Sequence, residues 1–392
     1  MCVSVSYKWK PLEDLPESWQ ELASEELEAL ASVWQEQRAS LVQTDAWQVF
    51  LKRLQREWAI ETGIIEQAYT LDRGVTQVLI ERGIDASLIS HADTDKDPEY
   101  VARVIQDHEE AMEGLFAFVK GEREPSTAYI KEIHAVMMRN QLSSLARNSL
   151  GRNIETPLLR GDYKKRPNNP LRPDGTLHQY CPPEQVASEM DRLIELHKAH
   201  QRIEVPPEVE SAWFHHRFSQ IHPFQDGNGR VARALSTLIL IKAGWFPLVV
   251  RRDNREGYIA ALEEADRGDL KNLVSLFVSL QKKAFVQAVG LSEEALQRRQ
   301  VDEVIASARD TLLKRREAAR GEWEEAKETA RVLQGIAKDR FQDVAQRLRG
   351  ELSSISPNYE FLIDNEELEG NRGHYFQWQI VETARDLGYF AN

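Results

Sequence analysis

One stretch of the sequence constrains the fold more than any other: Ile221-His-Pro-Phe-Gln-Asp-Gly-Asn-Gly-Arg-Val-Ala-Arg233. Apolar residues recur at helical spacing before it, from Trp213 to Ile221, and after it, from Val231 to Ile239. Two glycines flank Asn228 where the second helix should begin. The stretch therefore predicts a helix–loop–helix junction in which Asn228 caps the second helix.

The residue types in this loop indicate chemistry on a phosphorus group. A helix start with free backbone N–H groups and a positive dipole end suits phosphate. Arg230 and Arg233 are three residues apart, so they lie on one helix face and could clamp a polyphosphate. Asp226 supplies a hard oxygen ligand for Mg²⁺. His222 supplies an imidazole that could take a proton from an attacking hydroxyl.

Other interpretations of the same letters explain less. A dinucleotide fingerprint from Gly227 to Ala232 would have to follow a strand, whereas a helix is expected before it. His215 and His216 point apart on a helix, and no His-Glu-x-x-His occurs, so we expect a packing role and no zinc. A glycine-rich connector with chance charges would explain the glycines but not the charged residues converging on one turn.

The rest of the chain predicts a mainly α protein. Apolar residues at helical spacing predict further helices, at 22–33, 47–58, 74–82, 97–119, 127–140, from 184 onward and at 207–220. Proline and glycine interrupt residues 148–183, which predicts a long irregular loop or a short hairpin. Residues 301–350 mix charges of both signs, as expected of a solvated helical hairpin or arm. Residues 359–363 and 374–380 predict strands, with a turn region between them and a short helix after them.

Composition limits the cellular compartments and the classes of binding partner that suit this chain. The 392 residues carry a net charge of −13, which argues against coating of nucleic acid. Cys2 and Cys181 are too few for a disulfide framework or a cysteine-based zinc site. The N-terminus lacks a signal-peptide core, and Lys242 and Pro247 break the most apolar stretch. We therefore expect a soluble cytoplasmic protein with no membrane partner and no nucleic acid.

The pattern His222-Pro-Phe-x-Asp226-Gly-Asn-Gly-Arg230-x-x-Arg233 resembles the signature of the Fic (Fido) family at every fixed position. Residues 130–134 and 254–263 are similar to family sequences as well. The resemblance implies a mainly α fold with a Fic-type helical core and a short β-hairpin flap. The resemblance covers residues 97–285 well and the N-terminal helices more loosely, so we expect a helical N-terminal region (1–96) and a catalytic core (97–285). Residues 286–392 do not resemble the family, and their own patterns predict a helical extension that ends in a small α/β element.

For activity, the resemblance implies a protein adenylyltransferase that uses Mg²⁺ and ATP. AMP would pass to a Tyr, Thr or Ser hydroxyl of an unidentified target protein, and pyrophosphate would leave. His222 would be the general base, Phe224 the anchor of the loop and Asp226 the Mg²⁺ ligand. The remaining nucleotide-binding residues would be Gly227, Asn228, Gly229, Arg230, Arg233 and Tyr258. Gly229, rather than a lysine, resembles the AMP-transferring branch of the family more than the phosphorylating one.

Two further segments fit this resemblance. The flap would lie within Gly151–Cys181, where Lys164 stands in place of an expected arginine. Thr62-Gly-Ile-Ile-Glu66-Gln67 resembles the family's inhibitory helix, although Gln67 departs from the usual Gly or Asn. Glu66 would then pair with Arg233 and deny that arginine to the γ-phosphate.

The sequence leaves alternatives open. The main reaction could be removal of AMP from a modified protein, with Glu66 orienting a water, or the chain could be a non-catalytic nucleotide-sensing module. Self-modification and a homo-oligomer also stay open.

Overall fold

The computed structural model describes residues 5–121, 123–147, 153–172 and 175–353, together with residues 382 and 385. Contacts divide the chain into two units, residues 1–298 and residues 299–392. All the candidate site residues fall in the first unit. The domain boundaries expected at residues 96 and 285 stay predictions.

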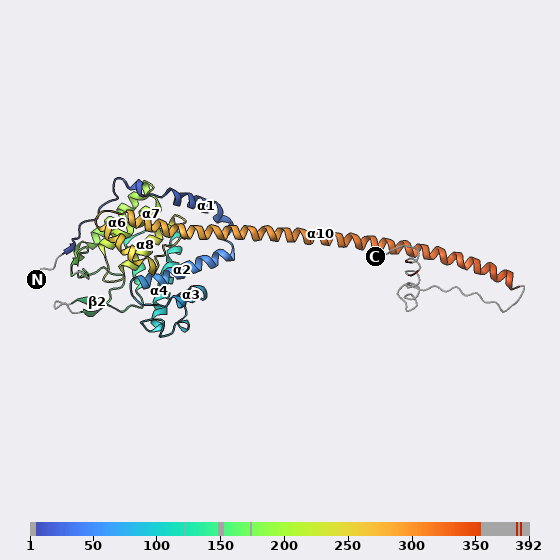
Figure 1. Cartoon of the computed structure of the whole chain (residues 1–392), viewed down its shortest axis with the longest axis horizontal. Coiled ribbons are helices and arrows are strands. Elements are labelled where there is room, and N and C mark those ends of the chain that lie inside the picture. Colours follow the sequence, from blue (N-terminus) through green and yellow to red (C-terminus); the bar gives the residue numbers. More distant parts are fainter. Residues whose placement is uncertain are drawn as a thin grey trace. The chain divides into compact units, whose positions relative to one another are not determined.

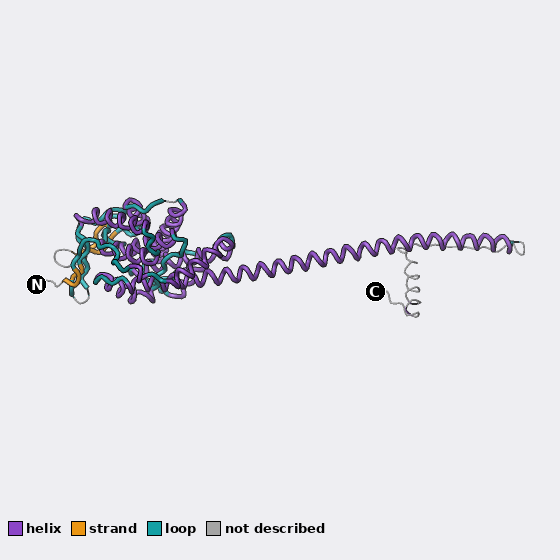
Figure 2. The backbone as a smooth tube through the Cα atoms, turned by 90° about the horizontal axis from the view of Figure 1, so that it is seen from above, coloured by secondary structure: helices purple, strands orange, loops and turns teal. Residues whose placement is uncertain are grey.

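Helices dominate the described residues of the first unit, and strands form only two small sheets (Figure 1, Figure 2). The expectation of a mainly α fold is therefore confirmed. The helices are α1 (Glu25–Leu41), α2 (Asp45–Ile65), α3 (Arg73–Arg82), α4 (Pro98–Lys120), α5 (Thr127–Met137), α6 (Val186–Arg202), α7 (Pro207–Ile221), α8 (Asn228–Lys242), α9 (Arg255–Asp266) and α10 (Lys271–Leu352), which continues into the second unit.

Local sequence explains where many of these helices begin. Side chains at several N-caps accept a hydrogen bond from a backbone N–H in the first turn: Ser24, Thr44, Asp72, Asp97 and Ser126. A cap of this kind stabilises a helix by about 1 kcal/mol. Helix α5 ends at Met137, three residues before the predicted end, because the chain turns there toward the first strand of a hairpin.

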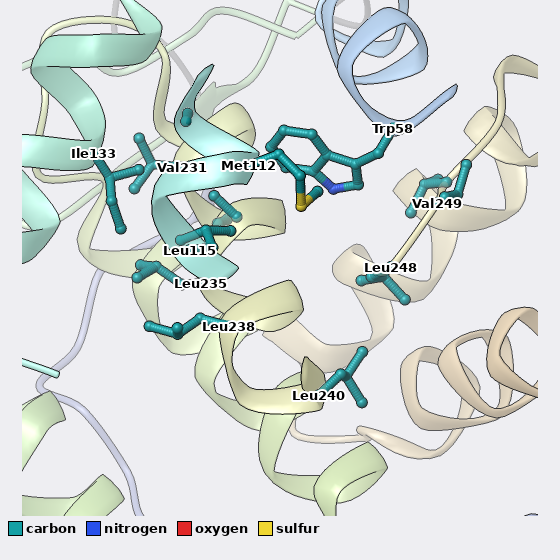
Figure 3. Packing of buried hydrophobic residues seen from close by; sticks show 14 of the residues in the cluster. Trp58, Met112, Leu115, Ile133, Val231, Leu235, Leu238, Leu240, Leu248 and Val249 are labelled. Carbon is teal, nitrogen blue, oxygen red and sulfur yellow. The ribbon is translucent and has the colours of Figure 1, made fainter. Parts of the chain in front are cut away.

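Helix α8 lies at the centre of the first unit and packs against α2, α4, α5 and α7. Figure 3 shows its apolar side chains next to Met112 and Leu115 of α4 and Ile133 of α5. Val231, Leu235 and Leu238 are each at most 2% exposed. Burying one such side chain contributes roughly 1.5–3 kcal/mol, so the helix that follows the signature loop is held rigidly.

The strands form two separate pairs. Strand β1 (Val5–Tyr7) runs parallel to β4 (Leu177–His178), and β2 (Ser143–Arg147) runs antiparallel to β3 (Asn153–Pro157). The second pair is the short hairpin that the family resemblance implied. Its first strand lies before the predicted flap range of Gly151–Cys181, so that range was wrong at its N-terminal end. The sequence of β2 lacks the apolar alternation that marks a strand.

Helix α10 is a single helix of 82 residues, as expected of an arm and not of a helical hairpin. Its first part buries Leu273, Phe277 and Phe285 in the first unit. In the second unit, most described side chains between 309 and 353 are exposed, in agreement with the mixed charges. No helix among the described residues combines the length and apolar character needed to span a bilayer. The α/β element expected at 359–380 and beyond falls outside the described residues.

Candidate active site

The signature loop connects α7 to α8 as the sequence predicts. Helix α7 ends at Ile221, and His222 adopts a left-handed backbone with φ 51° and ψ 58°. The N-cap of α8 is Gly227, with φ 79°, so the prediction that Asn228 caps this helix was wrong. The Asn228 side chain instead bonds the N–H and the carbonyl of Phe224, each at 2.8 Å. These bonds close the loop, and the positive φ falls to a glycine, which tolerates it.

The imidazole of His222 is held from two sides. Its Nδ1 lies 3.2 Å from the carbonyl oxygen of Ser219, and its ring stacks on Tyr180 at 3.7 Å and 4°. A carbonyl can only accept, so Nδ1 carries the proton and the lone pair is on Nε2. Desolvation, followed by the charge of Lys164, lowers the pKa of His222 to about 3. The ring is therefore neutral near pH 7, and Nε2 can accept a proton.

Asp226 is ionised and partly exposed. Its Oδ1 accepts from the N–H of Gly227 at 2.6 Å, and its Oδ2 accepts from Gln141 at 2.7 Å. Burial opposes ionisation, but Arg230 and these two hydrogen bonds outweigh it and lower the pKa of Asp226.

One carboxylate in this state fits a Mg²⁺ site that is completed by substrate phosphates and water. A set of three His, Cys, Asp or Glu residues that could hold a metal by themselves does not occur among the described residues.

The two arginines of α8 are both buried and have different partners. Arg233 donates through Nε to Thr62 Oγ1 at 2.7 Å, through Nη1 to Glu66 at 2.9 Å and through Nη2 to the Thr62 carbonyl at 2.9 Å. Arg230 donates to Gln141 Oε1 at 2.8 Å. The Nε of Arg230 is buried without a protein partner. Arg230 therefore keeps a donor for a ligand, whereas all three nitrogens of Arg233 are engaged.

Glu66 lies directly over the start of α8. A Cβ added to Gly229 would come within 2.2 Å of Glu66 Oε1, so a larger residue at this position would displace the Glu66 carboxylate. The first N–H groups of any helix lack partners within the helix and attract anions. The carboxylate of Glu66 thus occupies the region where a phosphate would approach α8. The structure brings together Thr62, Glu66 and Arg233, which the sequence linked through the inhibitory motif.

The loop is anchored on its other side by Phe224 and His134. Phe224 is completely buried and stacks on His134 at 3.8 Å and 10°. Gly161 donates its N–H to His134 Nδ1 at 2.9 Å, so the proton lies on Nε2, which is 3.0 Å from the Asp226 carbonyl. His134 is the last residue of the segment 130–134, which resembles family sequences. Its contacts make it a support for the loop.

Part of this chain is similar in sequence to a known protein family. Residues 124–240 match the Fic/DOC family. The matched residues include α7, the signature loop and most of α8. Protein adenylyltransferase fic-1 of Caenorhabditis elegans is 31% identical over 105 residues, which is 27% of this chain and 20% of the relative. Protein adenylyltransferase Fic of Nematostella vectensis is 41% identical over 64 residues, 16% of this chain and 15% of the relative. The matches thus span a fifth or less of these curated relatives.

Solved structures share the fold of much of this chain. A Fic domain-containing signaling protein from Bacteroides thetaiotaomicron aligns with a TM-score of 0.53 at 20% identity, covering 69% of this chain and 96% of that one. Fic-1 from Caenorhabditis elegans aligns with the same TM-score and identity, covering 69% of this chain and 71% of that one.

A row of buried, hydrogen-bonded polar side chains extends from Arg233. Tyr258 is 4% exposed and hydrogen-bonds Arg233. The Tyr258 hydroxyl lies 2.6 Å from His215 Nε2, and His215 Nδ1 lies 3.0 Å from Ser236 Oγ. Direct nucleotide binding by Tyr258 stays a prediction, and the contacts favour an indirect role through Arg233. His216 bonds Asp266 at 3.0 Å, consistent with the packing role expected of both histidines.

The predicted flap residue Lys164 does not lie on the hairpin. Its N–H donates to the Pro223 carbonyl at 2.8 Å, and its Nζ donates to Asn168 at 2.9 Å and to the Ile221 carbonyl at 3.3 Å. It is 3% exposed, and desolvation lowers its pKa to about 8. Lys164 therefore helps to hold the signature loop in place through the carbonyls of Ile221 and Pro223.

Sequence reasoning missed three further residues near the site: Gln141, Tyr180 and Gln225. Each contacts a motif residue or, for Gln225, occupies the variable position of the motif. A glutamine or tyrosine outside a fixed position has no local signal that would have revealed these contacts.

Proposed function

We propose that this chain is a protein adenylyltransferase that transfers AMP from Mg-ATP to a hydroxyl of a target protein and is restrained by Glu66. The observation that carries the proposal is the convergence of His222, Asp226 and Arg230 at the start of α8. A non-catalytic sensor would not need a neutral, oriented imidazole in this position. The curated relatives named above carry the name protein adenylyltransferase, which supports the same activity.

In the proposed reaction, the acceptor oxygen attacks the α-phosphorus of ATP. A bond forms between that oxygen and phosphorus, and the bond from phosphorus to the bridging oxygen breaks, so that pyrophosphate leaves. Nε2 of His222 takes the hydroxyl proton, because its lone pair is free and Nδ1–H is held by Ser219. The stacked ring of Tyr180 holds the imidazole orientation during this transfer.

Charge neutralisation is the second requirement of phosphoryl-type transfer. Bound Mg²⁺ would neutralise phosphate charge, and Asp226 would be its protein ligand. Arg230 would release Gln141 or use its free Nε to bind phosphate. The N–H groups of Gly229 and its neighbours at the start of α8 would contact phosphate oxygens once Glu66 moves away.

Restraint by Glu66 follows from competition for one guanidinium. Arg233 cannot bind a γ-phosphate through Nη1 while that nitrogen donates to Glu66. The carboxylate over Gly229 also repels an approaching phosphate. A buried charge pair of this kind contributes little net stability, which suits a contact that must open.

Removal of AMP is a second candidate, because the same position of Glu66 could serve it. Oε1 of Glu66 is engaged by Arg233, and the Glu66 side chain is 25% exposed. A carboxylate at this point could orient a water toward a phosphorus bound at the start of α8. Replacement of Glu66 should then slow the removal of AMP from a modified protein, whereas it should speed the addition of AMP.

ATP labelled at the α- or the γ-phosphate separates these possibilities. Incorporation of the α-label into protein supports AMP transfer, and incorporation of the γ-label indicates phosphorylation instead. Binding without incorporation, in the chain and in its Glu66→Gly variant, would support a sensor. The target, self-modification, the oligomeric state and the cytoplasmic location stay predictions.

A further inference from the structure

The hairpin β2–β3 contacts the signature loop through the side chain of Gln225. Its Nε2 lies 2.7 Å from Ser144 Oγ and 2.8 Å from Thr156 Oγ1. Ser144 and Thr156 are directly opposite each other in the ladder, so one amide bridges both strands. The Oε1 of Gln225 accepts from the N–H of Leu159 at 3.4 Å, just after β3.

Gln141, which precedes β2, makes a second connection. Its Nε2 donates to Asp226 Oδ2 at 2.7 Å and to the Ser143 carbonyl at 3.1 Å, and its Oε1 accepts from Arg230 at 2.8 Å. One side chain at the base of the hairpin thus contacts both the candidate metal ligand and a candidate phosphate ligand. Both glutamines therefore connect the same two elements, the hairpin and the loop.

The hairpin depends on such contacts. A two-stranded sheet alone is marginally stable in water. Successive side chains of a strand alternate between faces, so Ser144 and Thr156 face the loop while Leu145 and Glu155 face away. Leu145 is 73% exposed, so the described residues leave this side chain of the outer face largely uncovered. The hydrogen bonds of Gln225 to Ser144 and Thr156 therefore orient the inner face of the hairpin toward the signature loop.

We infer that Gln225 and Gln141 are positioning residues that fix the hairpin relative to the signature loop and thereby hold the loop that carries His222 and Asp226 in the geometry needed for in-line attack. The consequence for transfer rests on the proposed function, but the connection itself is a property of the folded chain. A shift of about 1 Å between reacting groups can cost on the order of 100-fold in rate. Gln225 is the cleaner test, because Gln141 also touches Asp226 and Arg230.

Hydrogen exchange of residues 143–157 tests the connection without relying on activity. Gln225→Ala should raise exchange of the hairpin amides by roughly 10-fold relative to the unaltered chain, since it removes the hydrogen bonds to Ser144 and Thr156 and the longer ones to the Pro157 carbonyl and the Leu159 N–H. The double variant Ser144→Ala/Thr156→Val should also raise exchange, and Gln225→Ala should add less to the double variant than it adds to the unaltered chain, because only the longer bonds to Pro157 and Leu159 are left to lose. Glu155→Ala, on the outer face of the same strand, is the matched control and should leave exchange unchanged. Unchanged hairpin exchange in Gln225→Ala would overturn the inference.

Transfer kinetics test the positioning role. In the Glu66→Gly background, with the chain itself as the labelled acceptor, Gln225→Ala should lower α-label incorporation by roughly 10- to 100-fold. The dissociation constant for Mg-ATP should stay within a few-fold. A substitution that disordered the whole loop, with its candidate phosphate ligands, would instead lower both the affinity for Mg-ATP and the rate of transfer. Equal loss of binding and transfer, or unchanged transfer, would contradict the positioning role. Absence of label in the Glu66→Gly chain itself would count against the proposed function, while the exchange data would still decide the connection.

Discussion

Arg233 donates a hydrogen bond to Glu66 at 2.9 Å, between residues that are 167 positions apart in the chain. Thr62 engages the other two nitrogens of the same guanidinium. Arg233 is 1% exposed and Glu66 is 25% exposed, so the arginine is fixed and the glutamate is the partner that solvent or a ligand can reach. Release of the contact therefore requires movement of Glu66, not of α8.

Glu66→Gly should raise AMP transfer. Leaving one member of a buried pair alone usually costs a few kcal/mol, but incoming phosphate compensates Arg233, so we expect a gain of about 10- to 1000-fold. The initial rate of α-label incorporation at saturating Mg-ATP measures it. Glu66→Gln keeps the shape without the charge and should give an intermediate gain. A Glu66→Gly rate no faster than that of the unaltered chain would refute restraint by Glu66.

His222→Ala should abolish transfer and leave Mg-ATP binding within a few-fold, because a general base acts on the transition state. The lowered pKa of His222, about 3, means that its imidazole is already neutral at mildly acidic pH. The transfer rate should therefore be flat between about pH 5.5 and 7.5, provided that the nucleotide-free pKa persists in the complex. A rise in rate with a midpoint near pH 6.5 would indicate that ATP binding restores an ordinary imidazole pKa.

Asp226→Asn should weaken Mg²⁺-dependent nucleotide binding by on the order of 10-fold or more, since a neutral amide is a poorer ligand for a hard cation. Calorimetric titration with ATP, with and without Mg²⁺, measures the loss. Binding of ATP without the metal should change much less. If the enhancement of binding by Mg²⁺ is the same in the variant, Asp226 is not the metal ligand.

Tyr258→Phe should lower Mg-ATP affinity by a few-fold to about 10-fold in the Glu66→Gly background, because one hydroxyl contact that orients Arg233 is lost. Tyr129→Phe is the matched control, since Tyr129 is also buried and its hydroxyl bonds the Gly114 carbonyl away from α8. Equal affinity losses in the two variants would show that Tyr258 acts only through stability.

Acid should destabilise the fold through buried neutral histidines. Burial lowers the pKa of His108 to about 3, from an ordinary value near 6.5. Below pH 6.5 the unfolded chain binds a proton that the native His108 does not, so native stability falls as the pH drops toward 3. The slope is at most about 1.4 kcal/mol per pH unit for one group.

His108→Gln should flatten this dependence between about pH 6 and 4, as measured by urea unfolding at several pH values. The His108→Gln substitution itself could lower stability at every pH, so the comparison concerns the slope alone. An unchanged slope would mean that His108 does not contribute to acid destabilisation.

Sequence reasoning was most successful where the relevant information is local. The helices α3, α4 and α7 begin and end within a residue or two of the predicted bounds, because apolar periodicity and capping residues act over a few positions. The loop residues from His222 to Arg233 are contiguous, so their chemistry could be recognised as a set. The Thr62–Glu66 motif could be recognised in the same way.

Contacts between distant segments were not predictable from those patterns. Gln141 and Gln225 meet the site because α5, the hairpin and the loop pack together, and neither glutamine has a distinguishing sequence signal. The start of the hairpin was misjudged, and the choice between a helical hairpin and an arm for residues 301–350 stayed open, since weak strands and long polar helices lack strong periodicity.

By itself, the sequence determined that the chain folds around helices and carries a complete signature loop, because periodicity, caps and a contiguous motif are local properties. Only the tertiary structure decided that Nε2 of His222 carries the lone pair, because the Ser219 carbonyl engages Nδ1. It also decided that Glu66 lies over Gly229 and engages Arg233. These outcomes depend on distances between side chains on different helices, which packing of the whole core sets and no short stretch of sequence contains.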